Sequence, residues 1–322
     1  MKTTLIEAVR DRSIPIPAKG HSLSRLLLTG MRPHQWAKNL FVLAPLLFGK
    51  KLDDPQALAL ALLACAAFCL MSSSLYLLND IFDAAADCAH PEKRGRPIAS
   101  GELPVRIALA GAAALLGVSL GLARALGSPF LWLGVAYFVL TLGYSLVFKR
   151  AIVLDGMVIA TGFVLRVVGG ALAVHVVASH WLIICAFLLA LYLAFAKRRQ
   201  ELLLLSGSAN RHREVLGQYS VAYLDQVNGI LLAAVIVCYA LYTVAPETTA
   251  RFGTDRLIYG TVFVLYGLLR YMALIQKPAN GGNPSRMLVA DKPLLASVLA
   301  WAAYNAAVIY QSSLAALWNR WP

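Results

Sequence analysis

The sequence predicts an all-α membrane protein with nine membrane-spanning helices. Of its 322 residues, 59% are hydrophobic and only 14% are charged, which is far too apolar for a soluble domain. The apolar residues gather in runs of about 20, the length that a helix needs to cross a bilayer. The sequence has no alternation of apolar and polar residues that would indicate strands. A helical bundle inside the membrane is therefore the expected fold.

The nine expected spans follow one another along the chain, and the first is the shortest. They cover residues 35–49, 56–79, 105–126, 128–148, 151–174, 178–196, 227–246, 257–275 and 293–317. Residues 1–31 are expected to form a polar, irregular N-terminal arm, because Pro15 and Pro17 argue against a continuous helix there. Residues 32–322 are expected to form a single membrane domain.

The placement of positive charge predicts the orientation. The net charge is +13, which in a soluble protein would suggest nucleic acid, but in a membrane protein the position of the charges matters more. With nine spans, 22 of the 29 Lys and Arg residues lie on the side of the N-terminus and six on the other side. Without the first span the two sides would be nearly equal. We therefore expect a cytoplasmic N-terminus, an external C-terminus and no nucleic-acid partner.

Three aspartates follow the second apolar run at spacings of three and four residues. These spacings place Asp80, Asp83 and Asp87 on one face of a helix. Three carboxylates on one face repel one another unless a cation lies between them. Mg²⁺ in proteins usually takes one or two carboxylates together with substrate phosphates. The cluster therefore predicts a Mg²⁺ site that holds a phosphate-bearing substrate.

Three basic residues follow the aspartates in the next loop. Lys93, Arg94 and Arg96 could bind phosphate, because Arg offers a planar fork of donors and Lys a point charge. The alternative is a loop that follows the positive-inside rule and contacts only lipid head groups. The neighbouring aspartates favour a site for phosphate with Mg²⁺.

A second polar pair follows the sixth apolar run. Lys197 and Glu201 are four residues apart and share a helix face. An ordinary ion pair at a helix end, which contributes little to stability, is one interpretation. The other is a second half of the site, facing the aspartates, with one cation and one carboxylate.

Isolated polar residues in or near apolar runs are further candidates. Arg166 lies inside the fifth run, where a charged residue usually faces a functional cavity, although it could instead pair with another helix. Asp155 is eleven residues earlier, about three turns, and so on a similar face. Lys38 and Asn39 open the first run and could either anchor the helix at the interface or reach the polar cavity.

These features together resemble the UbiA superfamily of intramembrane prenyltransferases. The resemblance lies in the nine helices, the N-D-x-x-D-x-x-x-D motif at the end of the second helix and the polar pair at the end of the sixth. It extends over nearly the whole chain from Arg32 on. Most members have a second D-x-x-x-D motif where this chain has Lys197-Arg-Arg-Gln-Glu201. That change is similar to one branch, the decaprenyl-phosphate phosphoribosyltransferases.

Several other stretches are also similar to that branch. They are RPHQWAKNLFVLAP (32–45), YLLNDIFDAAADCAHPEKRGRPIASGELP (76–104), YSLVFKR (144–150), LRVVGGALA (165–173) and KRRQEL (197–202). The branch transfers 5-phosphoribose from phosphoribosyl diphosphate (PRPP) to a polyprenyl phosphate and releases diphosphate, for cell-wall arabinan precursors. The resemblance implies the same reaction, substrates and Mg²⁺ here, in the inner membrane of a bacterium with the site on the cytoplasmic face. The sequence does not give the oligomeric state, and the resemblance is compatible with a homo-oligomer.

The resemblance assigns roles to individual residues. Asp80, Asp83, Lys197 and Glu201 are the expected catalytic residues, and Asp80, Asp83 and Asp87 the expected metal ligands. The expected substrate-binding residues are Lys38, Asn39, Asn79, Lys93, Arg94, Arg96, Lys149, Arg166 and Arg198. Lys197 should weaken a second metal site and favour direct contact with a phosphate, and PRPP has a 5-phosphate besides its diphosphate.

Two other functions remain open from the sequence. One is an ordinary prenyltransferase that moves an isoprenoid from its diphosphate to an aromatic acceptor, which the cation at position 197 argues against. The other is a membrane transporter or lipid-binding protein without catalysis. Transporters often have inverted repeats with interrupted helices, and this sequence shows neither.

Overall fold

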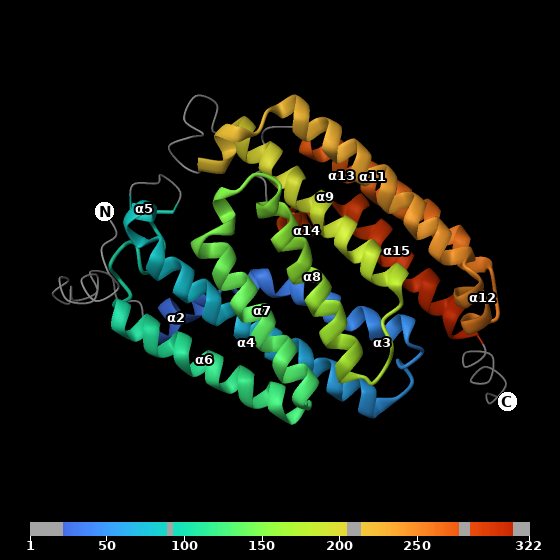
Figure 1. The fold of residues 1–322 in the computed structure, drawn as a ribbon, viewed down its shortest axis with the longest axis horizontal. Helices are drawn as coiled ribbons and strands as arrows, with labels where there is room; N and C mark the ends of the chain where they lie inside the picture. Colours follow the sequence, from blue (N-terminus) through green and yellow to red (C-terminus); the bar gives the residue numbers. More distant parts are fainter. Residues whose placement is uncertain (1–21, 89–92, 205–213, 277–283, 312–322) are drawn as a thin grey trace. The chain divides into compact units, whose positions relative to one another are not determined.

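The structure, a computed structural model, describes residues 22–88, 93–204, 214–276 and 284–311. These residues form helices and irregular segments, with no strand among them, which confirms the expected all-α class. Eight helices in the described part of the chain are long and apolar enough to cross a membrane (Figure 1). The count of nine spans is therefore still a prediction.

The segment expected as the first span is helical, but most of it is not an α-helix. Pro33–Leu43 form the 3₁₀ helix η1, and Ala44–Phe48 form the short α-helix α3. A 3₁₀ helix rises about 2.0 Å per residue and an α-helix about 1.5 Å, so this segment is roughly 30 Å long, the thickness of a bilayer core. A crossing here would therefore depend on 3₁₀ geometry, which a search for 20-residue α-helices does not detect.

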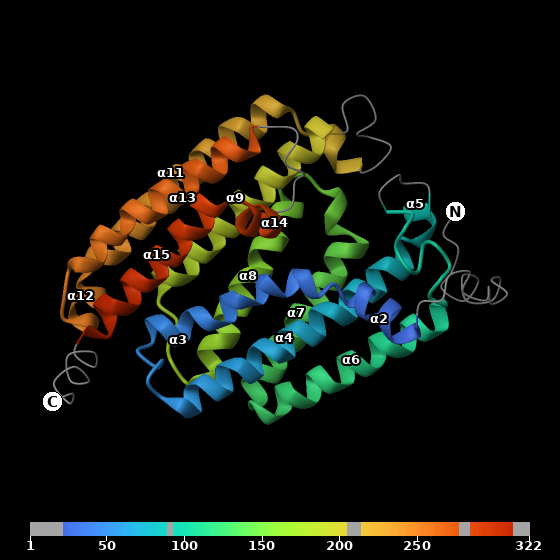
Figure 2. The same ribbon diagram turned by 180° about the vertical axis from the view of Figure 1, so that it is seen from behind.

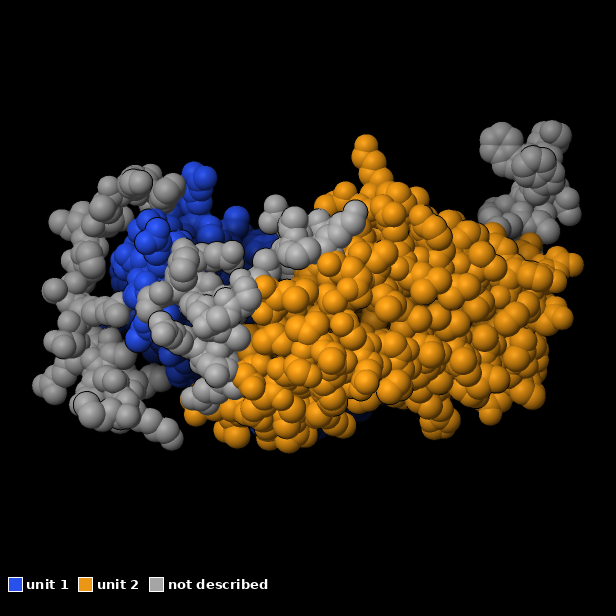
Figure 3. Space-filling view, turned by 90° about the horizontal axis from the view of Figure 1, so that it is seen from above, with its two compact units in different colours: residues 1–40, 62–145 blue, residues 41–61, 146–322 orange. Residues whose placement is uncertain are grey.

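The chain divides into two compact units, which are described separately. Unit 1 contains residues 1–40 and 62–145, and unit 2 contains residues 41–61 and 146–322 (Figure 3). Both η1 and the long helix α4 (Pro55–Phe82) contribute residues to each unit.

Unit 1 is a set of helices packed through small residues. Besides most of α4, it contains α2 (Leu23–Met31), α5 (Ala84–Cys88), α6 (Val105–Ala125) and nearly all of α7 (Ser128–Leu146). The Ser74 hydroxyl on α4 donates to the Ala112 carbonyl on α6 at 2.8 Å, and the Ser119 hydroxyl on α6 donates to the Ala67 carbonyl on α4 at 2.8 Å. Such small polar residues allow two helices to approach closely in a bilayer.

Helix α2 was not expected from the sequence. Ser22 caps its first turn by accepting a hydrogen bond from the Arg25 amide at 3.4 Å. Leu26 is buried on α2, and a Cβ on Gly30 would lie 2.6 Å from Leu77 of α4. The expectation of an irregular arm is therefore wrong for residues 23–31, and residues 1–21 lie outside the described part of the chain.

Unit 2 is built around helix α9. Its α-helices are α3, α8 (Leu154–Ala173), α9 (His180–Leu204), α11 (Val221–Val244), α12 (Pro246–Phe252), α13 (Thr261–Ile275), α14 (Pro284–Ala290) and α15 (Lys292–Ile309). Its short 3₁₀ helices are η2 (Phe148–Arg150), η3 (Glu214–Gln218) and η4 (Arg256–Gly260). Helix α9 packs against both α8 and α11 (Figure 2). The core between them includes Tyr192, Phe195 and Leu231.

Two glycines allow α8 to approach its neighbours in unit 2. A Cβ on Gly170 would lie 1.9 Å from the Val42 carbonyl oxygen, so the backbones of α8 and η1 touch at this point. A Cβ on Gly156 would lie 3.1 Å from Phe195 of α9. Because a backbone oxygen cannot rotate away as a side chain can, position 170 accepts only glycine without a shift of the helix.

Three helix boundaries differ from the expected ones and affect the candidate site. Helix α9 continues to Leu204, past the end of the apolar run at residue 196, so Lys197 and Glu201 lie within its last turns, as expected for a pair that shares a helix face. Helix α11 begins at Val221, where the Ser220 side chain caps it. Helix α8 begins at Leu154, three residues later than expected, because Val153 has a positive φ of 67° that no α-helix contains.

Candidate active site

The predicted acidic cluster lies at the junction of α4 and α5 in unit 1. Helix α4 ends at Phe82 and α5 begins at Ala84, with Asp83 as a turn between them. The turn keeps the helical hydrogen bonds, from the Asp83 amide to the Asn79 carbonyl (2.9 Å) and from the Asp87 amide to the Asp83 carbonyl (2.8 Å). The expected helical spacing of the aspartates is therefore confirmed, apart from the break at Asp83.

Two arginines neutralise the buried carboxylates of this cluster. Asp80 and Asp87 are each 3% exposed. The Arg96 Nη1 atom donates to Asp80 Oδ1 at 3.0 Å and to Asp87 Oδ2 at 2.5 Å. The Arg32 Nη2 atom also donates to Asp80 Oδ1. Arg96 was among the predicted residues, whereas Arg32 was missed although it opens the first stretch that resembles the family.

Arg32 reaches Asp80 from an unusual backbone conformation. It caps the end of α2 with φ 55° and ψ 61°, in the left-handed region that residues other than glycine rarely adopt. Its guanidinium lies 5.2 Å from the centre of the Tyr76 ring, so the ring supports it through a cation–π contact. Both neighbours of the guanidinium come from α4, which fixes its direction.

Two carboxylates of this cluster lie close enough together to share one cation. One guanidinium nitrogen lies within 3.0 Å of oxygens from both Asp80 and Asp87, so a cation already occupies the point between the two carboxylates. Mg²⁺ commonly uses one or two protein carboxylates and takes its other ligands from phosphates and water. Among the described residues, no group of three His, Cys, Asp or Glu side chains is placed to hold a metal ion. A metal here would therefore need oxygens from a substrate.

The other predicted residues of unit 1 lie at different depths. Asp83, Asn79 and Lys93 are half-buried, and Arg94 is exposed. The chain turns at Lys93, whose carbonyl accepts the Arg96 amide hydrogen bond at 2.9 Å. This turn brings Arg96 back to the aspartates, while residues 89–92 of the same loop lie outside the described part of the chain.

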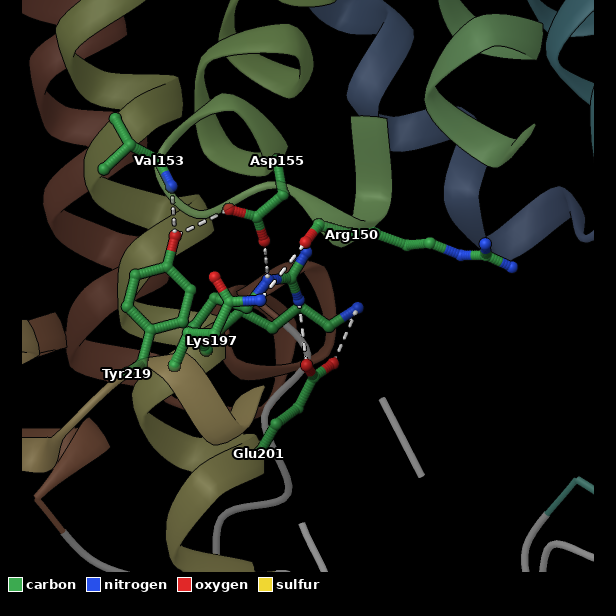
Figure 4. Close-up of polar contacts among 8 residues, drawn as sticks. Arg150, Val153, Asp155, Lys197, Glu201 and Tyr219 are labelled. Atoms are coloured by element: carbon green, nitrogen blue, oxygen red, sulfur yellow. Dashed lines mark hydrogen bonds and ion pairs between the residues drawn. The ribbon is translucent and has the colours of Figure 1, made fainter. Parts of the chain in front are cut away.

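A second charged cluster in unit 2 contains the predicted Lys197 and Glu201. The two side chains form the expected ion pair, with 3.6 Å between Nζ and Oε1 (Figure 4). Lys197 is 44% exposed, so its ammonium is accessible. Glu201 also accepts a hydrogen bond from Arg198 Nη1 at 2.8 Å. Arg198 itself is 2% exposed and faces protein carboxylates.

Asp155 is the buried centre of this second cluster. Its Oδ2 atom accepts a hydrogen bond from Arg198 Nε at 2.7 Å, and its Oδ1 atom accepts one from the Tyr219 hydroxyl at 2.7 Å (Figure 4). The sequence suggested that Asp155 lies on the same face as Arg166. Tyr219 was not identified, because it lies between two apolar runs and belongs to no motif.

Three further predicted substrate-binding residues are Arg166, Asn39 and Lys38. Arg166 is buried, donates to the Gly162 carbonyl one turn earlier at 2.9 Å and lies over the Phe163 ring at 5.1 Å. Asn39 is buried and donates to Cys69 Sγ at 3.1 Å. Lys38 is half-buried. The roles of these three residues in substrate binding remain predictions.

The comparison with known families agrees with this arrangement. The model of the UbiA prenyltransferase family matches residues 40–287, which is well over half of the chain. The chain belongs to the UbiA prenyltransferase family. This membership makes it an integral membrane transferase and accounts for polar clusters at the ends of otherwise apolar helices.

Individual UbiA-family proteins are similar over most of the chain. The decaprenyl-phosphate phosphoribosyltransferase of Corynebacterium glutamicum is 33% identical over 303 residues, 93% of this chain and 90% of that protein. The protein of the same name from Mycolicibacterium smegmatis is 32% identical over 296 residues, 89% of this chain and 93% of that one. The solved structure of a UbiA homolog from Archaeoglobus fulgidus, bound to GPP and Mg²⁺, is 20% identical and covers 88% of this chain and 99% of its own, with a TM-score of 0.67. This last likeness shows a shared fold.

Proposed function

We propose that this UbiA-family protein transfers 5-phosphoribose from PRPP to a polyprenyl phosphate and releases diphosphate. The observation that carries the proposal is the accessible ammonium of Lys197 beside Glu201, at the place where most family members have a second pair of aspartates. A cation at this place suits direct contact with a phosphate. The names of the relatives from Corynebacterium glutamicum and Mycolicibacterium smegmatis support the same reaction.

The proposed reaction exchanges one phosphate for another at the anomeric carbon. The bond between ribose C1 and the diphosphate oxygen breaks, and diphosphate leaves with the electron pair. An oxygen of the lipid phosphate forms the new bond to C1, which has oxocarbenium character in the transition state. Because a phosphate monoester is already anionic at neutral pH, the lipid needs no strong general base.

The carboxylates of unit 1 are proposed to hold Mg²⁺. Asp80 and Asp87 would be its protein ligands, with Asp83 beside them. When bound, Mg²⁺ supplies Lewis-acid stabilisation of the leaving diphosphate. Arg96 would leave the point between the two carboxylates when the ion binds, and it would then add its positive charge beside the metal together with Arg32. Fixed positive charges stabilise the negative charge that develops on a leaving phosphate.

Further cations are proposed to bind the remaining phosphates. Lys197 and Lys149 of unit 2 would contact PRPP. Lys93 and Arg94, in the loop that leads to Arg96, would add positive charge beside the carboxylates of unit 1. Lys38 and Arg166 are the candidates for the lipid phosphate. Glu201 is proposed to orient Lys197, since the two side chains are 3.6 Å apart.

A test of donor choice decides between this function and an ordinary prenyltransferase. Purified protein in detergent receives either PRPP with polyprenyl phosphate or a prenyl diphosphate with 4-hydroxybenzoate, each with Mg²⁺. We expect diphosphate release and a phosphoribosylated lipid only with the first pair. Product from the second pair alone would overturn the proposal and favour prenyl transfer, and no turnover with either pair would favour a role in transport or lipid binding.

A further inference from the structure

The backbone just before α8 is strained at one residue. Val153 has φ 67° and ψ −48°, and the Leu154 amide donates to the Ile152 carbonyl at 2.7 Å. This is a γ-turn with positive φ at its central residue, a rare conformation, and Val is β-branched, which makes it less favourable still. Such a conformation persists only where the surroundings enforce it, and it is often found at functional sites.

The Tyr219 hydroxyl enforces this turn. It accepts a hydrogen bond from the Val153 amide at 2.7 Å and donates one to Asp155 Oδ1 at 2.7 Å (Figure 4). Tyr219 is 5% exposed, and its ring packs against Phe195 and stacks on Tyr223. Burial, together with the Asp155 carboxylate, raises the pKa of Tyr219 well above its usual value, so the hydroxyl keeps its proton.

A continuous set of contacts connects this turn to Lys197. Asp155 binds both Tyr219 and Arg198, Arg198 binds Glu201 at 2.8 Å, and Glu201 pairs with Lys197. Asp155 therefore connects two segments. Tyr219 links it to the turn at Val153, and Arg198 links it to the last turns of α9.

The same turn follows directly on two further cations. Lys149 and Arg150 form η2, and the Ala151 amide donates to the Phe148 carbonyl at 3.1 Å. The Gln218 side chain, next to Tyr219, donates to the Arg150 carbonyl at 3.5 Å. Gln218 and Tyr219 thus hold the backbone at Arg150, where η2 ends, and at Val153, the central residue of the turn.

We propose that Asp155 and Tyr219 are positioning residues that set the direction of two phosphate-binding cations of unit 2, Lys149 in η2 and Lys197 on α9. The inference rests on the proposed function, because it assigns these cations to the PRPP donor. Asp155 and Tyr219 themselves touch no substrate in this proposal. They act by holding η2 and the last turns of α9 in one fixed arrangement within unit 2.

A simple attachment of α8 to α9 would not need these residues. Asp155 is fully buried and Arg198 is 2% exposed, and burying such a pair carries a large desolvation penalty. Apolar side chains of similar volume often hold two helices together as well as a buried ion pair does. The strained turn at Val153 adds a further unfavourable contribution. The buried ion pair and the strained turn are both explained if they serve to orient the cations of η2 and α9.

The test compares two tyrosines that stack on each other. Tyr219→Phe removes the hydroxyl that holds Val153 and Asp155, and Tyr223→Phe removes the hydroxyl of an exposed tyrosine at the start of α11. For Tyr219→Phe we expect the KM for PRPP to rise about three- to tenfold, the effect of one net hydrogen bond, with a smaller change in kcat. The KM for polyprenyl phosphate should be unaffected. Tyr223→Phe should have normal kinetics, and equal values for both variants would overturn the proposal.

A double-mutant cycle separates positioning from general stability. If Tyr219 acts through Lys197, the KM increases of Tyr219→Phe and Lys197→Ala should not multiply in the double variant. Independent, multiplying effects would overturn the proposal. Hydrogen exchange gives a readout without turnover, because the Val153 amide should exchange faster in Tyr219→Phe and at the normal rate in Tyr223→Phe. Equal exchange in both variants would also overturn it.

The same cycle distinguishes failure of this inference from failure of the proposed function. If the wild-type protein uses a prenyl diphosphate and not PRPP, the phosphoribosyl function fails. The kinetic cycle is then repeated with the prenyl diphosphate, and non-multiplying KM increases for that donor would retain the positioning role. If Tyr219→Phe has normal kinetics with the donor that the wild-type protein uses, the positioning role of Tyr219 is refuted. Asp155→Asn tests the other end of the network, and Asp155→Glu should restore part of the activity.

Discussion

Removing the Lys197 ammonium tests the proposed contact with PRPP. The Lys197–Glu201 pair is long, at 3.6 Å, and the Lys197 side chain is 44% exposed. Exposed ion pairs of this kind contribute only about 0–1 kcal/mol to folding, so Lys197→Ala should leave the melting temperature nearly unchanged. A lost contact to a charged phosphate costs about 1.5–3 kcal/mol, which corresponds to roughly ten- to a hundredfold in kcat/KM for PRPP.

The assay measures initial rates over a series of PRPP concentrations at saturating polyprenyl phosphate, and then over a series of polyprenyl phosphate concentrations at saturating PRPP. The KM for PRPP should rise strongly and the KM for the lipid only slightly. Lys51→Ala is the matched control, because Lys51 forms a similar exposed pair with Asp54 at 3.3 Å and is 41% exposed. Equal kinetics for both variants would refute the phosphate contact, and an equal loss for both substrates would indicate a distortion of α9.

Three further outcomes are expected. A chelator should abolish turnover, and added Mg²⁺ should restore it. The variants Asp80→Asn and Asp83→Asn should each lose most activity yet remain folded, and full activity of both variants would refute the assigned metal site. A tag at the N-terminus should be cytoplasmic and one at the C-terminus external, and two tags on the same side would contradict nine spans. Gly170→Ala should lower the melting temperature, because its Cβ would lie 1.9 Å from the Val42 carbonyl oxygen. Gly117→Ala on α6 is the control, because no atom lies within 4 Å of the added Cβ, and it should gain up to about 1 kcal/mol of stability from helix propensity. Equal shifts in melting temperature for the two variants would refute the close approach of Gly170 to Val42.

The fold class and the charged motifs could be predicted because they depend on local pattern. The apolar runs predicted eight spans that the described part of the chain contains, five of them within three residues at both ends, since a membrane imposes a fixed length on every helix. The pair of Lys197 and Glu201 followed from helical spacing alone. These features need no knowledge of which helices are neighbours.

Contacts between segments could not be predicted from one sequence. Asp155 was noted with Arg166 on its own helix, but its partner Arg198 lies 43 residues away on α9. The start of α8 was placed too early because Ala151–Leu154 are all apolar, and hydropathy carries no information about φ. The strained turn depends on Tyr219, whose hydroxyl reaches Val153 from 66 residues further along the chain.

The left-handed backbone at Arg32 places two contributions to stability in opposition at one position. Glycine there would relax the backbone, because a residue with a Cβ loses about 1–2 kcal/mol in this conformation. It would also take a guanidinium from the buried Asp80 carboxylate, and removing one partner of a buried ion pair is strongly destabilising. The second effect is the larger, so selection for thermal stability should retain arginine at position 32 in spite of its backbone conformation.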